Sequence, residues 1–375
     1  MSPNFSSIQT KRRYQLIATE TRIAKFRMKM ETAGISAAII TSPENRYYFS
    51  DFRGSSGALL ITKENAWLFT DFRYTDQASD ESPLYEIVNH NREMYQTIST
   101  YIKDHSINEV GIEQVTLPVN DYMEIKEHLS DVEFSSIDDS IFDLRMIKDE
   151  EEIGYLRKAV AICDKAFEHI LNYIRPGVSE KDIGMELEFA MRRAGAEAIK
   201  TNHVIASGER ASLPHGQATD RIVKVGDFVK MDFGARVNGY YSDFTRTVVL
   251  GEPSEKQRKI YDIVRTAQEA SLKAIGPGKT CSEMDEIGRS IIREAGYGEN
   301  FGHSLGHSIG LAVHEKPAMR KTDYTMLQPG MIITVEPGIY ISEFGGVRIE
   351  DLIVITEDGY ENFAHATKDL QVIPV

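Results

Sequence analysis

The sequence has little cysteine and no long apolar run. Its 375 residues include two cysteines, Cys163 and Cys281, which lie far apart and are expected to be reduced thiols. No apolar run approaches the roughly 20 residues of a membrane-spanning helix, and the start of the chain lacks the hydrophobic segment of a secretory signal. These absences argue against a membrane protein and a disulfide-stapled secreted domain, and they predict a cytoplasmic location.

The sequence also has fewer basic than acidic residues. Lys and Arg total 43 against 57 Asp and Glu, which gives a formal net charge of −14. Binding to nucleic acid needs clustered Lys and Arg, so no nucleic-acid partner is expected. The apolar fraction of 41% and the charged fraction of 27% are ordinary for a globular enzyme, and the length predicts about two domains.

The most informative residues are Asp232 and Asp243, which lie in two strand-like runs rich in Val, Phe and Tyr. Asn238-Gly239 between them predicts a two-residue hairpin turn, because a type I′ turn needs positive φ at both positions. Such a turn sets Asp232 opposite Thr245 and makes Asp243 its diagonal neighbour on one face. Two facing carboxylates repel unless cations lie between them, so the pair favours two divalent metal ions. The alternative is two solvated acids near a turn.

Further acids and histidines follow in the last third of the chain. Glu336 ends one apolar strand-like run and Glu350 lies in another, where a carboxylate is costly to bury unless it is paired or metal-bound. His303, His307 and His314 share one glycine-rich segment. Packed, hydrogen-bonded imidazoles are the alternative to ligands here, and spacing alone does not choose between His303 and His307.

The chain is expected to divide near residue 140, into residues 1–140 and 141–375. The first part alternates strands and helices, such as the helix Met94–Asp104, which predicts a small α/β domain. Its expected strands are Ala37–Ile40, Ala58–Ile61, Ala66–Phe69, Glu86–Val88, Glu109–Ile112 and Val132–Phe134.

The second part contains an internal repeat. Ile174-Arg-Pro-Gly177 recurs as Ile275-Gly-Pro-Gly278 at an offset of 101, and each copy precedes a helix, Glu180–Arg193 and Ser282–Glu294. The repeat predicts a duplicated half, although Pro-Gly before a helix is also common punctuation. A doubly wound fold is not expected, because no Gly-rich phosphate loop follows a strand.

These motifs resemble those of the pita-bread metallopeptidases, which include proline-specific aminopeptidases and dipeptidases, methionine aminopeptidase and creatinase. The words "DFG", "SDFTRT", "VEPG" and "VRIED" carry the resemblance, and "SPENRYYFSDF" resembles the creatinase-like N-terminal domain of the proline-specific branch. The expected class is therefore α+β, with a creatinase-like domain before a pita-bread domain and an extension of about 20 residues at the start. By this resemblance, the metal ligands are Asp232, Asp243, His307, Glu336 and Glu350.

The resemblance also implies the chemistry. Glu336 is the expected general base, and His215, His303 and His314 are the expected substrate-facing histidines. The oxygen-rich ligand set favours two Mn²⁺ ions, with Co²⁺ or Zn²⁺ as alternatives. Arg348 either holds a metal-ligating carboxylate or pairs with a surface acid.

We therefore expect an Xaa-Pro aminopeptidase, a homodimer acting on peptides with proline at the second position. The alternative is an Xaa-Pro dipeptidase, which needs a cation such as Arg53 or Arg73 for the free carboxylate after the proline. Two functions outside peptide hydrolysis are a metal-free creatinase-like hydrolase and an inactive binding module. The complete set of expected ligands counts against both.

Overall fold

The computed structural model describes residues 5–200 and 203–375, and its contacts divide the chain into unit 1 (Met1–Arg145) and unit 2 (Met146–Val375). The sequence places the division near residue 140, which falls inside the helix α6 (Asp138–Met146). Two hydrogen bonds hold that helix to unit 1, from Tyr48 Oη to the Leu144 carbonyl (3.1 Å) and from Arg145 to Asn45 (2.6 Å). The division therefore falls at the last residue of α6.

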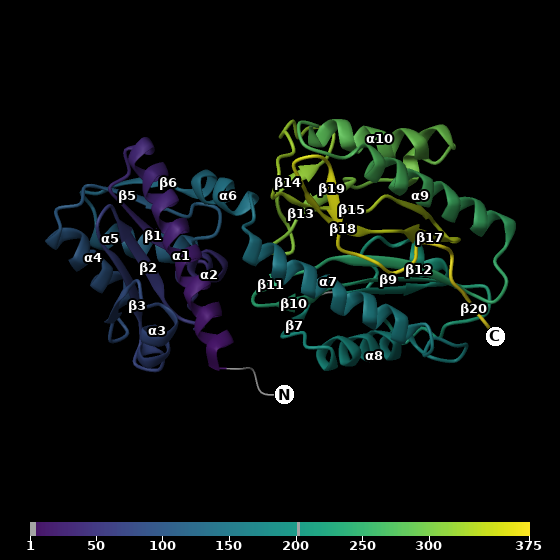
Figure 1. The fold of residues 1–375 in the computed structure, drawn as a ribbon, viewed down its shortest axis with the longest axis horizontal. Coiled ribbons are helices and arrows are strands. Elements are labelled where there is room, and N and C mark those ends of the chain that lie inside the picture. Colours follow the sequence, from purple (N-terminus) through teal and green to yellow (C-terminus); the bar gives the residue numbers. More distant parts are fainter. Residues whose placement is uncertain (1–4, 201–202) are drawn as a thin grey trace. The chain divides into compact units, whose positions relative to one another are not determined.

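Unit 1 is built on one six-stranded sheet in the order β4-β3-β2-β1-β5-β6 (Figure 1). The pairs β1–β2 and β2–β3 are antiparallel, and the other three are parallel. The strands are β1 (Ala37–Ile40), β2 (Ala58–Thr62), β3 (Ala66–Thr70), β4 (Glu86–Asn89), β5 (Glu109–Ile112) and β6 (Glu133–Ser136). The helices before α6 are α1 (Phe5–Ala33), α2 (Pro43–Ser50), α3 (Thr75–Glu81), α4 (Met94–Asp104) and α5 (Val119–His128). The expected strands are confirmed, with ends that differ by at most two residues.

The core of unit 1 explains why its strands read as continuous apolar runs. Alternate residues such as Ile39, Leu60 and Phe69 share one face of the sheet and pack with Ile98 and Ile102 of α4. The residues between them, such as Ala38, Leu59 and Leu68, are fully buried as well. Both faces of the sheet are therefore covered, as in other α/β folds.

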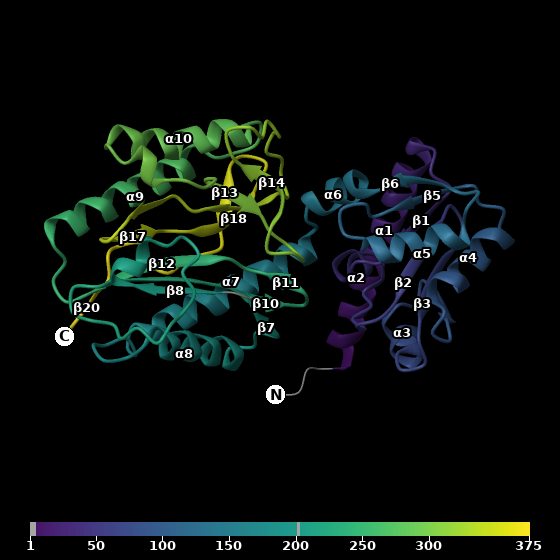
Figure 2. The same ribbon diagram turned by 180° about the vertical axis from the view of Figure 1, so that it is seen from behind.

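Unit 2 has two main sheets, β20-β12-β9-β8 and β14-β13-β15-β18-β19, and two smaller ones, β11-β10-β7 and β16-β17. Figures 1 and 2 both show its strands lying between the pair α7 and α8 and the pair α9 and α10. The helices are α7 (Glu150–Ile170), α8 (Glu180–Arg193), α9 (Glu255–Ala274) and α10 (Cys281–Glu294), with the 3₁₀ turns η1 (Gly208–Ser212) and η2 (Gly298–Asn300). The strands of the first half are β7 (Ala198–Ile199), β8 (Val204–Ser207), β9 (Phe228–Phe233), β10 (Ala235–Val237), β11 (Tyr240–Tyr241) and β12 (Phe244–Leu250). Those of the second half are β13 (Gly306–Ser308), β14 (Glu315–Met319), β15 (Ile332–Val335), β16 (Gly338–Ile341), β17 (Gly345–Arg348), β18 (Asp351–Ile355), β19 (Tyr360–Asn362) and β20 (Val372–Ile373).

The internal repeat corresponds to a structural repeat in unit 2. The bounds of α10 lie 101 residues after those of α8 at both ends, 180 to 281 and 193 to 294. Each helix begins with a capping box, from Ser179 in the first copy and Thr280 in the second. Gly177 and Gly278 before them both have positive φ, 95° and 82°, which a residue with a Cβ rarely adopts. The Pro-Gly words therefore mark equivalent turns.

The predicted hairpin is confirmed. Asn238 and Gly239 have φ values of 48° and 83°, both in the left-handed region that a type I′ turn requires. The turn joins β10 to β11, and the same register continues into the pairing of β9 with β12. Thr245 is consequently the partner of Asp232, as the two-residue turn predicts.

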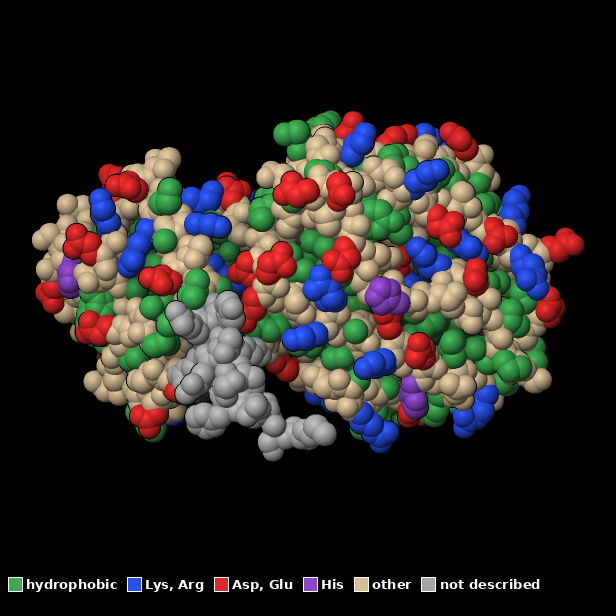
Figure 3. All heavy atoms as spheres, in the orientation of Figure 1, with side chains coloured by type: hydrophobic (Ala, Val, Ile, Leu, Met, Phe, Trp, Pro, Cys, Tyr) green, Lys and Arg blue, Asp and Glu red, His purple; other side chains and the backbone are tan. Residues whose placement is uncertain are grey.

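Three further features concern the cysteines, the helices and the surface charge. Cys163 and Cys281 are free and buried. Among the described helices, none combines the length and apolar character needed to cross a bilayer. On the face of unit 2 seen in Figure 3, acidic and basic side chains are interspersed, so the described side chains of that face form no continuous basic patch. Residues 1–4 of the expected N-terminal extension lie outside the described residues, and α1 begins directly after them.

Candidate metal centre

The structure brings together the five side chains expected to bind metal. Asp232 lies in β9 and Asp243 directly before β12, so the two come from one antiparallel ribbon. His307 lies in β13, Glu336 directly follows β15, and Glu350 lies between β17 and β18. The bridge between Glu350 and Thr245 joins this second group to the ribbon. Both repeats thus contribute to one buried cluster.

Two glycines allow the backbones to approach closely enough to form the cluster. A Cβ added to Gly234 would lie 2.0 Å from the Ser242 carbonyl oxygen, within the ribbon that bears both aspartates. A Cβ added to Gly306 would lie 1.8 Å from the Thr334 oxygen, where β13 meets β15. Since real Cβ atoms essentially never come so close, each position requires glycine.

His307 directs a free nitrogen lone pair at the carboxylates. Its Nδ1 lies 3.0 Å from the Ser308 carbonyl oxygen, which can only accept, so Nδ1 carries the proton. Nε2 is then left unprotonated, 3.3 Å from Glu336 Oε1 and 3.8 Å from Asp243 Oδ2. Burial lowers the pKa of His307, although Asp243 opposes the shift, so the imidazole is neutral. A neutral imidazole with a free lone pair is the form that binds metal.

Glu350 has one oxygen satisfied and one without a partner. Thr245 Oγ1 donates to Glu350 Oε2 at 2.6 Å, whereas Oε1 is buried and accepts no hydrogen bond. Burial and the neighbouring Asp243 and Glu336 raise the pKa of Glu350 well above its usual range. Burial likewise raises the pKa of Glu336 to about 8, with Arg348 opposing and Asp243 adding to the shift. The glutamate side of the cluster therefore favours protonated, neutral carboxyl groups when no further cation is bound.

Arg348 is buried against the aspartates and not paired with a surface acid, which decides between the two alternatives. Its Nη2 donates to Asp232 Oδ2 at 2.5 Å, and its Nη1 donates to Tyr340 Oη at 2.8 Å. Burial alone would raise the pKa of Asp232, but Lys200 and Arg348 hold it far below the usual range. Asp232 is therefore a charged carboxylate between two cations.

His303 is linked to Arg348 through Tyr340. Its Nδ1 donates to the Ser304 carbonyl oxygen (2.8 Å), so Nε2 accepts the hydrogen bond from Tyr340 Oη (2.8 Å). Burial, reinforced by the positive charge of Arg348, lowers the pKa of His303 to about 3. His303 is thus a neutral, oriented imidazole next to the cluster. Neither of its ring nitrogens is free to bind a metal ion.

The remaining two expected histidines flank the cluster and are exposed. The His314 ring lies 4.5 Å from that of His307, centroid to centroid. His215 lies on the loop that follows η1. Two buried cations donate to carbonyl groups of this loop: Lys230 Nζ to the Leu213 carbonyl (2.5 Å) and Arg348 Nη1 to the Pro214 carbonyl (3.1 Å). Burial and Arg348 lower the pKa of His215, so it too is biased towards the neutral form.

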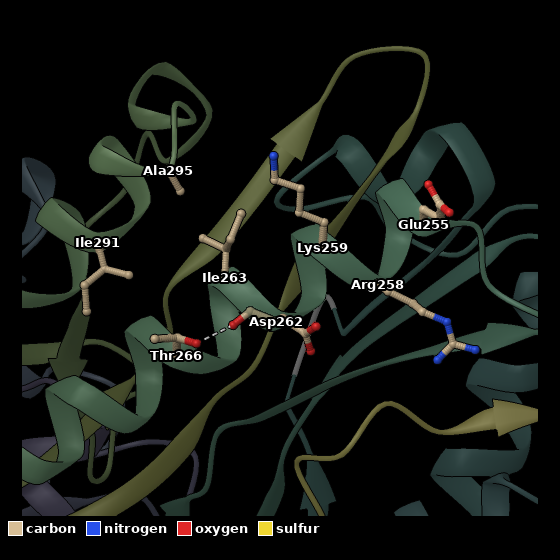
Figure 4. Close-up of a pocket in the computed structure, with 8 residues that line it drawn as sticks. All are labelled: Glu255, Arg258, Lys259, Asp262, Ile263, Thr266, Ile291 and Ala295. Carbon is tan, nitrogen blue, oxygen red and sulfur yellow. Dashed lines mark hydrogen bonds between the residues drawn. The ribbon is translucent and has the colours of Figure 1, made fainter.

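A separate surface hollow lies between α9 and the end of α10 (Figure 4). Its volume is about 540 Å³, and it is lined by Glu255, Arg258, Lys259, Asp262, Ile263, Thr266, Ile291 and Ala295. Thr266 donates to the Asp262 carbonyl within α9, as a helix-bound hydroxyl does. None of the expected site residues lines this hollow, so it is distinct from the cluster.

Comparison with known proteins decides the family. Residues 154–357 match the description "Metallopeptidase family M24", and residues 22–147 match "Creatinase/Prolidase N-terminal domain". The chain belongs to metallopeptidase family M24. The expected pita-bread fold and the creatinase-like first domain are therefore confirmed, and this M24 chain is an enzyme of the metallopeptidase class.

Several relatives of this M24 chain are similar over nearly its whole length. A solved Xaa-Pro dipeptidase from Bacillus anthracis is 44% identical, with a TM-score of 0.92, and covers 94% of this chain and 99% of its own. A solved X-Pro aminopeptidase from Thermotoga maritima is 37% identical, with a TM-score of 0.88 and the same coverage. The Xaa-Pro dipeptidase of Pyrococcus furiosus is 41% identical over 93% of this chain and 99% of that protein.

The donor set of this M24 chain fits divalent metal ions. Asp243, His307 and Glu350 each offer a ligand atom, and these atoms lie within 4.8 Å of one another. The buried Glu350 Oε1 has no other partner, and the His307 Nε2 lone pair points into the same space. Carboxylate oxygens with one imidazole suit Mn²⁺, Co²⁺ or Zn²⁺.

Three site residues escape the sequence reasoning. Lys230 precedes Asp232 by two positions, so strand periodicity could have shown that both project from one face. Tyr340 carries no signal beyond a strand-like context. Lys200 lies in no motif and is 32 residues from Asp232, yet its Nζ donates to both Asp232 and Asp243.

Proposed function

We propose that this chain is a metal-dependent Xaa-Pro dipeptidase, which hydrolyses the bond between an N-terminal residue and a following proline. The observation that carries the proposal is a cluster of four carboxylates around the unprotonated Nε2 of His307. One carboxylate oxygen, Glu350 Oε1, is buried there without a hydrogen-bond partner. Relatives of 41% to 44% identity bear the name Xaa-Pro dipeptidase, and one of 37% bears the name X-Pro aminopeptidase. This pattern favours the dipeptidase over the aminopeptidase that the sequence analysis preferred.

In this proposal the cluster holds two divalent ions, with Mn²⁺ as the first choice. Asp232 would hold one ion and His307 with Glu336 the other, and Asp243 and Glu350 would supply the remaining carboxylate ligands. When bound, such ions lower the pKa of a water molecule and polarise the carbonyl of the scissile bond.

The protein groups supply the proton transfer and the orientation of the substrate. Glu336 is the proposed general base, which accepts a proton from the attacking water and passes it to the leaving proline nitrogen. Neutral His314 and His215 are the proposed donors to the substrate carbonyl and to the negative charge that develops on it. His303, whose Nδ1 donates to Ser304 and whose Nε2 accepts from Tyr340, is proposed to face the substrate without donating to it. The Arg348 to Tyr340 to His303 hydrogen bonds keep the ring of His303 oriented.

The proposal is tested with three substrates that differ only after the proline. We expect the Mn²⁺-loaded protein to hydrolyse Met-Pro with a kcat/KM on the order of 10²-fold above Met-Pro-amide and Met-Pro-Ala, because a dipeptidase recognises the free carboxylate. Met-Ala is the control for the proline. Equal rates for Met-Pro and Met-Pro-Ala would support the aminopeptidase instead, and no hydrolysis of any of them would refute both.

A chelator separates this mechanism from the metal-free functions. A creatinase-like hydrolase would keep its activity after complete removal of metal. An inactive binding module would show no activity even before the metal is removed. The proposal requires activity that disappears with chelation and returns with Mn²⁺. The homodimer and the cytoplasmic location stay predictions.

A further inference from the structure

Lys200 occupies the space between the two aspartates of the metal cluster. It directly follows β7, and its backbone nitrogen donates to the Gly234 carbonyl at 2.7 Å, beside the ribbon that carries both acids. Its Nζ donates to Oδ1 of Asp232 and to Oδ1 of Asp243. The Lys200 side chain is only 10% exposed. A compact ammonium therefore stands where two facing carboxylates need a cation.

The opposite side of the cluster has no such ammonium among the described residues. Asp243 turns its other oxygen, Oδ2, towards His307 Nε2, and Glu350 Oε1 has no partner at all. The converging ligand atoms of Asp243, His307 and Glu350 consequently remain open to an ion. Lys200 neutralises the aspartate side, whereas Glu350 Oε1 on the other side has no hydrogen-bond partner.

An ammonium and a divalent ion cannot share the same position between two carboxylates. A metal ion that binds Oδ1 of both Asp232 and Asp243 must displace Nζ, because the ion would have to lie between the same two oxygens. The lysine stem is flexible and the ammonium strongly hydrated, so Lys200 can withdraw, but its ion pairs must be broken first. An ion on the His307 side meets no such competitor.

We propose that Lys200 is a built-in competitor for one of the two metal positions, stabilising the Asp232–Asp243 pair in the metal-free chain and weakening the binding of the second divalent ion. The inference rests on the metal-dependent function proposed above. It predicts unequal sites: an ion bound tightly by Asp243, His307 and Glu350, and a weaker one whose arrival requires the ammonium to leave.

The test is a titration of the metal-free full chain with Mn²⁺, by calorimetry and by counting bound ions after equilibrium dialysis. Lys200→Met removes the charge and keeps the length of the side chain. We expect the second Mn²⁺ to bind on the order of 10–100-fold more tightly to this variant, the scale on which groups beside metal ligands change affinity. The first should change by less than about threefold, because the Asp243 oxygen that faces His307 is not the one that Lys200 contacts.

Three further variants make the result specific. Lys200→Arg keeps the charge and should leave the second ion weak, whereas Lys200→Gln, a shorter neutral side chain, replaces Lys200→Met if that variant does not fold. Lys224→Met, at an exposed lysine of the same unit, controls for the loss of any positive charge. Equal affinity for the second ion in the wild type and both neutral variants overturns the inference.

A second measurement needs no activity. In a chelator, Lys200→Met should lose thermal stability relative to the wild type, and Mn²⁺ should restore it, because the aspartates then lack any cation between them. Unchanged stability of the metal-free variant would contradict the role of Lys200. If the wild type binds no Mn²⁺ at all, the proposed function is wrong. If the wild type and every variant have two sites of equal affinity, the role of Lys200 is wrong but the proposed function stands.

Discussion

Asp232 on the aspartate side of the cluster and the glutamates Glu336 and Glu350 on the other side carry the same chemical group in opposite electrostatic states. Lys200 contacts both aspartates and Arg348 contacts Asp232, whose pKa lies far below its usual range, whereas Arg348 Nε stays 3.8 Å from Glu336. The glutamates are buried with less neutralisation, and the pKa values of both are raised. Burial alone therefore does not decide the state of a buried acid; the number of cations in contact with it does.

The largest expected effect comes from Asp243, the residue shared by both sides. Asp243→Asn should lower kcat/KM for Met-Pro by about 10²–10⁴-fold or more, because it removes the charge of a proposed metal ligand and disturbs the positioning of the proposed base Glu336. Steady-state kinetics with saturating Mn²⁺ measures this. Asp358→Asn, at an exposed acid of the same unit, is the matched control. Wild-type rates in Asp243→Asn would refute the shared role.

A pair of variants tests the comparison directly in the metal-free protein. Asp232→Asn should destabilise it by about 3–5 kcal/mol, because Lys200 and Arg348 each lose a charged partner in a buried site. Glu350→Gln should change the free energy of unfolding by less than about 1 kcal/mol, since the lost repulsion offsets the altered hydrogen bonding. Urea denaturation in chelator, followed by circular dichroism, gives both values. A larger loss of unfolding free energy in Glu350→Gln than in Asp232→Asn would contradict the difference between the two sides.

Removal of metal should lower the unfolding temperature of unit 2 more than that of unit 1. Mn²⁺ at about 100 times its dissociation constant stabilises the folded state by about 2.7 kcal/mol, which corresponds to a rise of about 5–10 °C in the Tm of a unit the size of unit 2. Trp67, the single tryptophan, lies buried in β3 of unit 1, so its fluorescence follows unit 1. We expect the transition seen by circular dichroism to shift more than the Trp67 transition. Equal shifts would show that the units unfold together.

The smallest effect concerns pH. Because the pKa of His303 falls to about 3 in the folded chain, the unfolded chain binds more protons near pH 6, and stability decreases as pH falls. Between pH 7.5 and 5.5 this residue accounts for at most about 1.4 kcal/mol. His303→Asn should therefore show a shallower loss of Tm over this range, with His365→Asn at an exposed histidine as the control. An unchanged slope would contradict the neutral state of His303.

Short-range rules predicted much of the fold. Asn238-Gly239 fixed the turn, the turn fixed the register, and the register set Asp232 opposite Thr245, because each step depends on residues close in sequence. The strands of unit 1 could be predicted because each is bounded by turn residues and buried on both faces. The repeat of α8 and α10 was visible because the same turn precedes each helix.

The site was less predictable in its polar contacts than in its residue types. Arg348 had two open alternatives, and only packing shows that it contacts Asp232, 116 residues earlier in the chain. The choice of His307 over His303 was not available from spacing. The surroundings of Nε2 distinguish the two rings, because Nε2 of His303 accepts from Tyr340 whereas Nε2 of His307 faces Glu336 and Asp243. The predicted boundary near residue 140 falls inside α6, and the contacts of that helix with α2 carried no signal in the sequence.

The sequence by itself determined the ribbon, the repeated halves and the supply of acids and histidines, because periodicity, turn chemistry and family motifs act through neighbouring residues. Only the tertiary structure decided which carboxylate has a cation beside it and which has none. Lys200 reaches Asp232 and Asp243 across 32 and 43 residues, and Glu350 Oε1 is left without a partner at the same centre. Such contacts depend on how separate strands pack together, and no local pattern records that packing.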